Sequence, residues 1–277
     1  VFDIEVDATD IDKFVETVKA IAPTFGGINL EDIKAPESFE IERRLVEELN
    51  IPVMHDDQHG TAIISSAALL NALEIAEKDI SKIKVVVSGA GSAALACANL
   101  YVLLGVKPEN LYMFDVNGLL TTCREDVSEL QMRYAKSCDP APLSEIIKDA
   151  DMFLGLSVGG ILKPEMLLSM AANPIVFAMA NPEPEIDYNV AINTREDIIM
   201  ATGRSDYPNQ VNNVLGFPYI FRGALDVRAR KINEAMKMAA VRALAELAKT
   251  PVPEQVNIAY GEKKLVFGKD YIIPKPF

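Results

Sequence analysis

The residues best suited to chemistry start with a glycine turn. The sequence GAGS at residues 89–92 follows an uncharged β-branched run and precedes a helix-favouring run of small residues. A strand, a glycine turn and a helix in this order can bind a pyrophosphate. Gly89 permits the tight turn, Gly91 lets phosphates approach the backbone, and the helix N-terminus supplies free N–H donors. The predicted cofactor-binding residues of this turn are Gly89, Gly91, Ser92 and Ala93.

Two more candidates for cofactor binding end later strands. Asp115 lies about two dozen residues beyond Gly91, where an acid that binds the ribose hydroxyls is expected. Glycines also close ordinary turns, so it is this acid that favours a dinucleotide site over a structural turn. Ser157 ends the following strand. A carboxylate at Asp115 would repel a 2′-phosphate and so favours NAD, whereas Asn117 and Arg124 leave NADP open.

Four acids precede the glycine turn as two adjacent pairs, Glu31 with Asp32 and Asp56 with Asp57. Carboxylates without cysteine suit a hard cation such as Mg²⁺ or Mn²⁺. Neighbouring acids on a regular strand point to opposite faces, so the first pair converges only if the backbone turns there. From spacing alone, solvated loop acids or helix caps are the favoured interpretation, and a metal site is the alternative.

Histidine and asparagine side chains give weaker signals. His55 and His59 would share a helix face. Gly60, together with the acids between the two histidines, makes a loop the favoured interpretation and metal ligation by the imidazoles less favoured. Asn181, Asn212 and Asn213 offer uncharged amides that suit a small dicarboxylate or a carboxamide, although asparagine is also common in turns.

These residues are positioned by strands that alternate with helices. A strand ending in polar or glycine-rich residues is predicted at each of residues 85–87, 111–114, 151–157, 174–180 and 198–201. Strands joined by crossover segments form a doubly wound, mostly parallel α/β sheet, and ligands bind at the carboxyl ends of its strands. We therefore expect a Rossmann-type domain over residues 60–277, with a soft boundary near His59. A partial α/β substrate domain is expected over residues 1–59.

The helices around this sheet are predicted from apolar spacing and caps. The two in the first part of the chain cover residues 10–21, capped by Thr9 or Asp10, and residues 38–49, capped by Ser38. A loop at residues 55–61 leads into an alanine-rich helix that ends at Glu77. One long helix is expected over residues 223–248. A strand is one interpretation of residues 1–6, and residues 272–277 resemble an end without a closing element.

Composition excludes several classes of protein. The chain has 277 residues, of which 49% are hydrophobic, but no apolar run approaches the length of a membrane span. A net charge of −13 argues against a nucleic-acid surface. Three cysteines without metal-type spacing (Cys97, Cys123 and Cys138) indicate buried or incidental thiols in a reducing cytoplasm. We expect no signal peptide, membrane contact or nucleic-acid partner.

The motifs together resemble malic enzymes. FGGINLED at residues 25–32, HDDQHGT at 55–61, the glycine turn, Asn181-Pro and Asn212-Asn213 occur in the family's order. The similarity covers nearly the whole chain and is greatest to the bacterial NAD(P)-dependent, decarboxylating type. It implies oxidation of malate to pyruvate and carbon dioxide with reduction of NAD or NADP. It also implies Mg²⁺ or Mn²⁺ bound by Glu31, Asp32 and Asp57, Asp56 supporting the catalytic base, and Asn181 and Asn213 contacting malate.

One departure from the family matters for activity. The resemblance implies a tyrosine acid and a lysine base that precede Val1, so we expect a fragment that binds cofactor and cation without turning malate over. A homodimer or larger assembly is also implied, as is a fused phosphotransacetylase-like domain in some bacterial members. Two alternatives stay open: a metal-independent amino-acid or hydroxy-acid dehydrogenase, and a nucleotide-binding regulatory module without catalysis.

Overall fold

The computed structural model describes residues 1–137, 139–261 and 264–276, so Cys138 and Phe277 lie outside the described residues. Its strands are β1 (Ile28–Leu30), β2 (Val53–His55), β3 (Val85–Ser88), β4 (Leu111–Asp115), β5 (Gly118–Leu119), β6 (Met152–Gly155), β7 (Ile175–Ala178) and β8 (Ile199–Thr202). Its α-helices are α1 (Ile11–Ile21), α2 (Glu37–Glu48), α3 (Asp56–Ala76), α4 (Ser92–Leu104), α5 (Glu129–Met132), α6 (Leu143–Ile146), α7 (Pro164–Ser169), α8 (Tyr188–Thr194), α9 (Phe217–Asp226), α10 (Glu234–Lys249) and α11 (Glu254–Ala259).

The main sheet has the strand order β5-β4-β3-β6-β7-β8. The five predicted strands are confirmed as a parallel set, and β5 adds a short antiparallel edge that was not predicted. The chain moves outward from β3 to β4 and then returns to β6 on the other side of β3. The strand order therefore reverses between β3 and β6, and such a switch point opens a crevice at the carboxyl ends of the strands.

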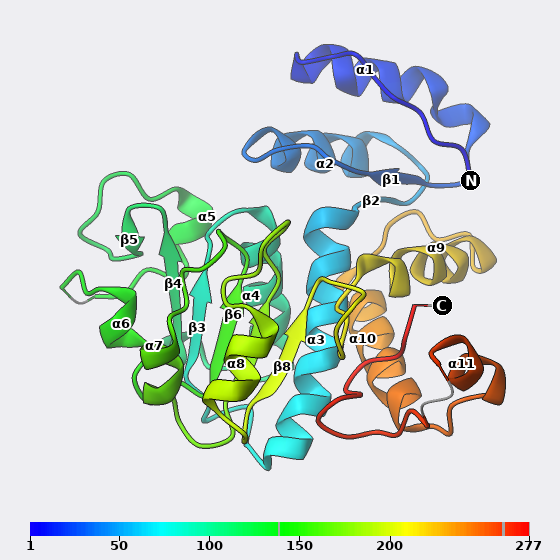
Figure 1. Cartoon of the computed structure of the whole chain (residues 1–277). Coiled ribbons are helices and arrows are strands. Elements are labelled where there is room, and N and C mark those ends of the chain that lie inside the picture. The colour runs from blue at the N-terminus through cyan, green and yellow to red at the C-terminus, as the bar shows by residue number, and fades with distance from the viewer. Residues whose placement is uncertain (138, 262–263, 277) are drawn as a thin grey trace.

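Both faces of the sheet are buried, as a doubly wound sheet requires. Alternate residues of β3 show this. Val85 and Val87 belong to the apolar core that includes residues of α3, α4 and α10, whereas Val86 belongs to the core on the other face, with residues of α7 and α8. Figure 1 shows the sheet between these layers of helices. The predicted Rossmann-type, mostly parallel α/β architecture is confirmed. No helix of the described residues combines the length and apolar composition needed to cross a bilayer.

Helix α3 is the central helix, and 16 of its 21 residues are buried. It begins at Asp56, so the predicted loop at residues 55–61 is wrong. Gly60 lies inside this helix. A Cβ at position 60 would lie 1.9 Å from Asp56 Oδ1, so glycine is needed there for close approach and not for a turn. A short connection joins α3 to β3, so α3 runs antiparallel to β3 and its first turn lies at the carboxyl edge of the sheet (Figure 1).

The boundary expected near His59 falls inside the first two turns of α3. The division into residues 1–59 and 60–277 stays a prediction. Before α3, the parallel pair β1–β2 packs with α1 and α2 around Val15, Leu30 and Leu45, which gives this part an α/β core of its own.

Two details of this first part differ from expectation. Asp10 caps α1 by accepting a hydrogen bond from Lys13 N, as predicted, but α2 begins at Glu37, so Ser38 is not its cap. Ser38 is instead fully buried inside the first turn. Residues 1–9 contain no strand.

The last third of the chain corrects two further expectations. The long helix predicted over residues 223–248 is two helices, α9 and α10, and Asn233 starts the second by accepting a hydrogen bond from Met236 N. The segment that was expected to lack packing is in contact with the core, because Ile272 and Ile273 are buried. Ile272 donates its N–H to Asn209 Oδ1 (2.9 Å), and its carbonyl accepts from Asn71 Nδ2 (2.8 Å).

Candidate cofactor and cation site

The turn between β3 and α4 has the geometry expected of a pyrophosphate cradle. Gly89 has φ of +118° and a Cβ there would lie 2.4 Å from Leu156 O, so both conformation and space require glycine. Gly91 is the N-cap of α4, and a Cβ there would have no atom within 4 Å. The first N–H groups of α4, from Ser92 and Ala93 onward, have no partner within the helix. The turn thus leaves room and donors for an anion.

Asp115 ends β4 beside this turn, as predicted, but its carboxylate is already paired. Arg124 binds both of its oxygens, with Nη1–Oδ1 at 2.9 Å and Nη2–Oδ2 at 2.6 Å, and the two side chains are 13% and 17% exposed. Arg124 also binds Asp126 at 2.6 Å. The position expected for the adenosine ribose therefore holds a carboxylate and a guanidinium together.

Ser157 lies beside the glycine turn, at the switch point. Its hydroxyl hydrogen-bonds Ser88 Oγ (2.8 Å), which joins the carboxyl ends of β6 and β3. Its backbone N–H donates to Glu185 Oε1 (2.9 Å). Glu185 is fully buried and was missed from sequence. A signal for it was present in Gly155, because a glycine inside a strand often marks the close approach of another group.

The two acid pairs come together where β1 meets the start of α3. Asp32 N donates to Asp57 Oδ2 (2.9 Å), and Glu31 accepts a hydrogen bond from Asn29 (2.6 Å). Partial burial of Glu31, together with repulsion by Asp56 and Asp57, raises the pKa of its carboxyl group to about 7. Burial raises the pKa of Asp56 to about 6, and its Oδ1 is buried without a hydrogen-bond partner among the described residues.

The carboxylate oxygens of these acids are the ligands that a hard cation prefers. A bound cation would also relieve the repulsion between the acids. Their side chains are not arranged as a finished ligand shell, however: the described residues contain no group of three or more His, Cys, Asp or Glu with that geometry. The assignment of Glu31, Asp32 and Asp57 to the cation stays a prediction.

Asn213 links these acids to the sheet. Its Oδ1 accepts from Thr61 Oγ1 (3.2 Å) and its Nδ2 donates to the Asp56 carbonyl (3.3 Å). Asn213 belongs to the segment that follows β8, so the carboxyl edge and the start of α3 are in direct contact. Asn181 is exposed beyond β7 and next to Gly203. The structure thus places Asn213 against Asp56 and leaves Asn181 open at the strand edge.

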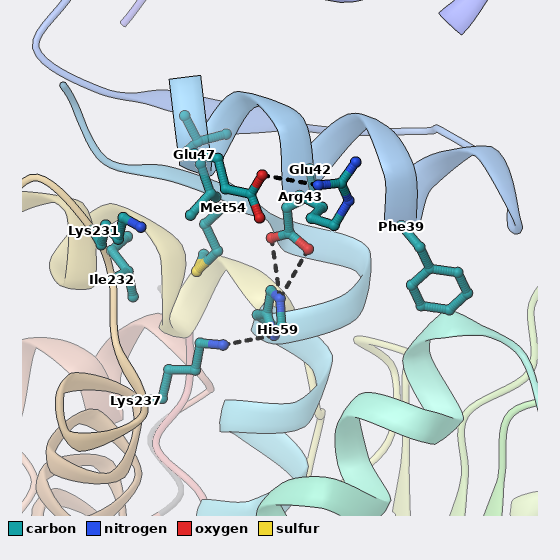
Figure 2. Close-up of a pocket in the computed structure, with 11 residues that line it drawn as sticks. Phe39, Glu42, Arg43, Glu47, Met54, His59, Lys231, Ile232 and Lys237 are labelled. Atoms are coloured by element: carbon teal, nitrogen blue, oxygen red, sulfur yellow. Dashed lines mark hydrogen bonds and ion pairs between the residues drawn. The ribbon is translucent and has the colours of Figure 1, made fainter. Parts of the chain in front are cut away.

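The imidazole rings of the two histidines have separate hydrogen-bond partners and do not converge. His55 is fully buried and its Nε2 lies 3.2 Å from Ile33 O. His59 lies on α3 and not in the predicted loop, and it connects Glu42 of α2 (3.1 Å) to Lys237 of α10 (3.0 Å), as Figure 2 shows. Burial opposes ionisation of Glu42, but hydrogen bonds from His59 and from His55 N keep its pKa below the usual value. The network lines a cavity of about 310 Å³ and fixes α3 between α2 and α10.

A doubly wound sheet with a glycine turn at its switch point and an acid at the end of the next strand defines a dinucleotide-binding α/β protein. Comparison with known sequences narrows this class. Residues 58–260 match the family "Malic enzyme, NAD binding domain", and residues 4–46 match "Malic enzyme, N-terminal domain". The chain belongs to the malic enzyme family.

Individual relatives agree with this. The chain is 57% identical over 274 residues to the NADP-dependent malic enzyme of Halomonas elongata, covering 99% of this chain and 65% of that protein. It is 58% identical over 278 residues to an NAD-dependent malic enzyme of Rhizobium meliloti, covering all of this chain and 36% of that protein. The chain therefore spans less than two thirds of the length of these relatives.

A solved structure agrees with the fold. The crystal structure of the NAD-dependent malic enzyme from Thermotoga maritima superposes with a TM-score of 0.87 at 41% identity, and covers 100% of this chain and 69% of that one. At this level of identity and overlap, the two chains share the same arrangement of helices and strands.

Proposed function

We propose that this chain is the dinucleotide- and cation-binding part of an NAD(P)-dependent malic enzyme, which oxidises malate to pyruvate and releases carbon dioxide. The names of the relatives support the reaction. The observation that carries the proposal is the contact of Asn213 with Asp56, because it brings the carboxyl edge of the dinucleotide sheet against the acid cluster. A substrate held there would lie between a hydride acceptor and a cation.

The residues of this chain have separate tasks in the proposal. The pyrophosphate binds at the glycine turn, formed by Gly89, Gly91, Ser92 and Ala93. Asp115 binds the adenosine ribose, and Ser157 contacts the nicotinamide side of the dinucleotide. Asn181 and Asn213 orient malate through uncharged amides, which hold carboxylates without adding a buried charge. NAD or NADP, when bound, accepts the hydride from malate.

Glu31, Asp32 and Asp57 would hold Mg²⁺ or Mn²⁺. Such a cation, when bound, polarises the hydroxyl and the later ketone of the substrate. Asp56 lies one residue before Asp57. Its Oδ1 is buried without a partner among the described residues, so it can accept a hydrogen bond from the catalytic base. A buried acceptor without a hydrogen-bond donor is costly. The unpartnered Oδ1 of Asp56 is therefore expected to gain a donor that the described part of the chain does not supply.

The test is turnover by the full-length product of the gene, with the 277-residue chain measured beside it. We expect the full-length protein to reduce NAD or NADP only when malate and Mn²⁺ are both present, and to release carbon dioxide. The chain alone should bind cofactor without turnover. Reduction of cofactor by malate without metal, or without carbon dioxide, would favour a metal-independent hydroxy-acid dehydrogenase instead. Cytoplasmic location, homo-oligomeric assembly and a fused phosphotransacetylase-like domain stay predictions.

A further inference from the structure

Glu185 is a buried carboxylate with no task in the chemistry described so far. It is 0% exposed and its two oxygens accept from different loops. Oε1 accepts from Ser157 N (2.9 Å), and Oε2 accepts from Ala180 N (3.0 Å). Burial raises the pKa of Glu185, while these backbone N–H donors act in the opposite direction by stabilising the carboxylate.

The backbone around Glu185 joins the same two loops. Leu162 N donates to Glu185 O (2.9 Å), and Gly160 N donates to Pro184 O (3.0 Å). The side chain lies so close to β6 that a Cβ on Gly155 would be 2.2 Å from Glu185 Cδ. The loop after β6 and the loop after β7 are therefore joined as one unit, with the Glu185 carboxylate as their shared acceptor.

The position of this unit relates it to one half of the dinucleotide. The pyrophosphate cradle follows β3, and Asp115 on the β4 side marks the adenosine half. A dinucleotide lies across the switch point, so its other half must extend over the ends of β6 and β7. Ser157 and Asn181 lie at those ends, and the backbone N–H groups of Ser157 and Ala180 are fixed by Glu185.

We propose that Glu185 is a positioning residue for the nicotinamide half of the cofactor. It acts through Ser157 and the Ala180–Asn181 backbone, and it sets where the nicotinamide lies relative to the substrate amide of Asn181. This inference rests on the proposed dinucleotide site and goes beyond it, because it assigns the two halves of the ligand to different supports.

The test compares two ligands that differ in the nicotinamide half. Reduced NAD carries the nicotinamide, whereas ADP-ribose keeps the adenosine, the pyrophosphate and the second ribose without it. The affinities of the 277-residue chain for both are measured by calorimetry, and the emission spectrum of bound NADH reports the surroundings of the nicotinamide. Glu185→Gln keeps the shape of the side chain but turns an N–H group toward one of the two backbone donors.

A matched control exists at the opposite edge of the same sheet. Asp151 is also a carboxylate that joins two segments, accepting from Lys84 N (2.8 Å) and Lys78 Nζ (2.5 Å). Asp151→Asn therefore makes the same chemical change at the amino ends of the strands, away from the cofactor. Thermal unfolding of both variants is recorded, and Glu185→Asp replaces Glu185→Gln if the latter does not fold.

We expect Glu185→Gln to weaken NADH at least about tenfold and to shift its emission, with ADP-ribose changed by less than about twofold. Asp151→Asn should leave both affinities unchanged. Equal weakening of the two ligands, or no weakening of NADH, would overturn the inference. Wild-type chain that bound neither ligand would overturn the proposed dinucleotide site, and this inference with it.

Discussion

At the scale of single residues, the two glycines of the β3–α4 turn do different work. Gly89 is required by the fold, because its φ is positive and the Leu156 carbonyl occupies the space of a side chain. Gly91 has an ordinary φ of −82° and open space around it. The protein alone gives no steric reason for glycine at position 91, whereas a phosphate approaching the α4 N-terminus does.

Gly91→Val should therefore leave the chain folded and reduce its affinity for NAD(P) at least about tenfold, or roughly 1.4 kcal/mol. Calorimetric titration with thermal unfolding measures both effects. The comparison variant is Gly89→Ala. Backbone strain at the positive φ should lower its free energy of unfolding by about 1–3 kcal/mol, and the clash with the Leu156 carbonyl adds to this loss. Unchanged dinucleotide affinity in folded Gly91→Val would show that the turn is only structural.

The Asp115–Arg124 pair should set the choice between NAD and NADP. Asp115→Ala removes a ribose acceptor and frees a guanidinium that could bind a 2′-phosphate, so the NAD-to-NADP affinity ratio should fall at least about tenfold. Asp126→Asn removes the other, more exposed partner of Arg124 and should change the ratio much less. A constant ratio across these variants would make Asp115 a structural strand end.

The sequence predicts some of these residues and not others for a physical reason. Asp115 is predictable because a fixed strand-helix-strand length separates it from Gly91. Its pairing with Arg124 depends on the β5 turn that folds residues 118–126 back on β4, and no periodicity marks that turn. Glu185 is held by backbone N–H groups of two loops that are distant in sequence. Gly155 indicates that some group approaches β6 closely, but nothing in the spacing shows that the group is Glu185.

At the scale of elements, α3 organises the molecule. It is buried along most of its length, carries Asp56 and Asp57 in its first turn, and contacts the sheet, α4 and α10. Acids in the first turn of a helix are favoured by its dipole. The continuous apolar runs of the strands and the alanine-rich body of α3 were predictable. The first turn of α3 was not, because Gly60 suggests a turn unless the position of the Asp56 carboxylate is known.

Replacing two helix glycines by alanine should change the free energy of unfolding in opposite directions. Replacing glycine by alanine inside a helix normally stabilises by about 0.5–1 kcal/mol, and Gly223→Ala in α9 should do so since its Cβ would meet no atom within 4 Å. Gly60→Ala should destabilise instead, because its Cβ would displace the Asp56 carboxylate. Denaturant unfolding of the two variants measures both signs, and stabilisation by Gly60→Ala would contradict the position of Asp56.

At the scale of the whole molecule, a net charge of −13 opposes the anions that the proposed function requires. Malate and the dinucleotide are both negatively charged, and the acid cluster adds local repulsion. In the proposed function, the α4 N-terminus would offset this repulsion for the pyrophosphate, and a cation at Glu31, Asp32 and Asp57 would offset it for malate. The carboxyl edge of the sheet and the first turn of α3 meet at Asn213, so the proposed site would combine parts that are far apart in sequence.

The most direct test of the proposed dinucleotide and cation site is a crystal structure of the chain with NAD⁺ and Mn²⁺. Anomalous diffraction data would locate the manganese. We predict the pyrophosphate against Gly91 and the start of α4, and the nicotinamide over the ends of β6 and β7. A manganese peak should lie about 2.0–2.6 Å from oxygens of Glu31, Asp32 and Asp57. A dinucleotide bound away from this edge, or manganese bound away from these acids, would contradict the account.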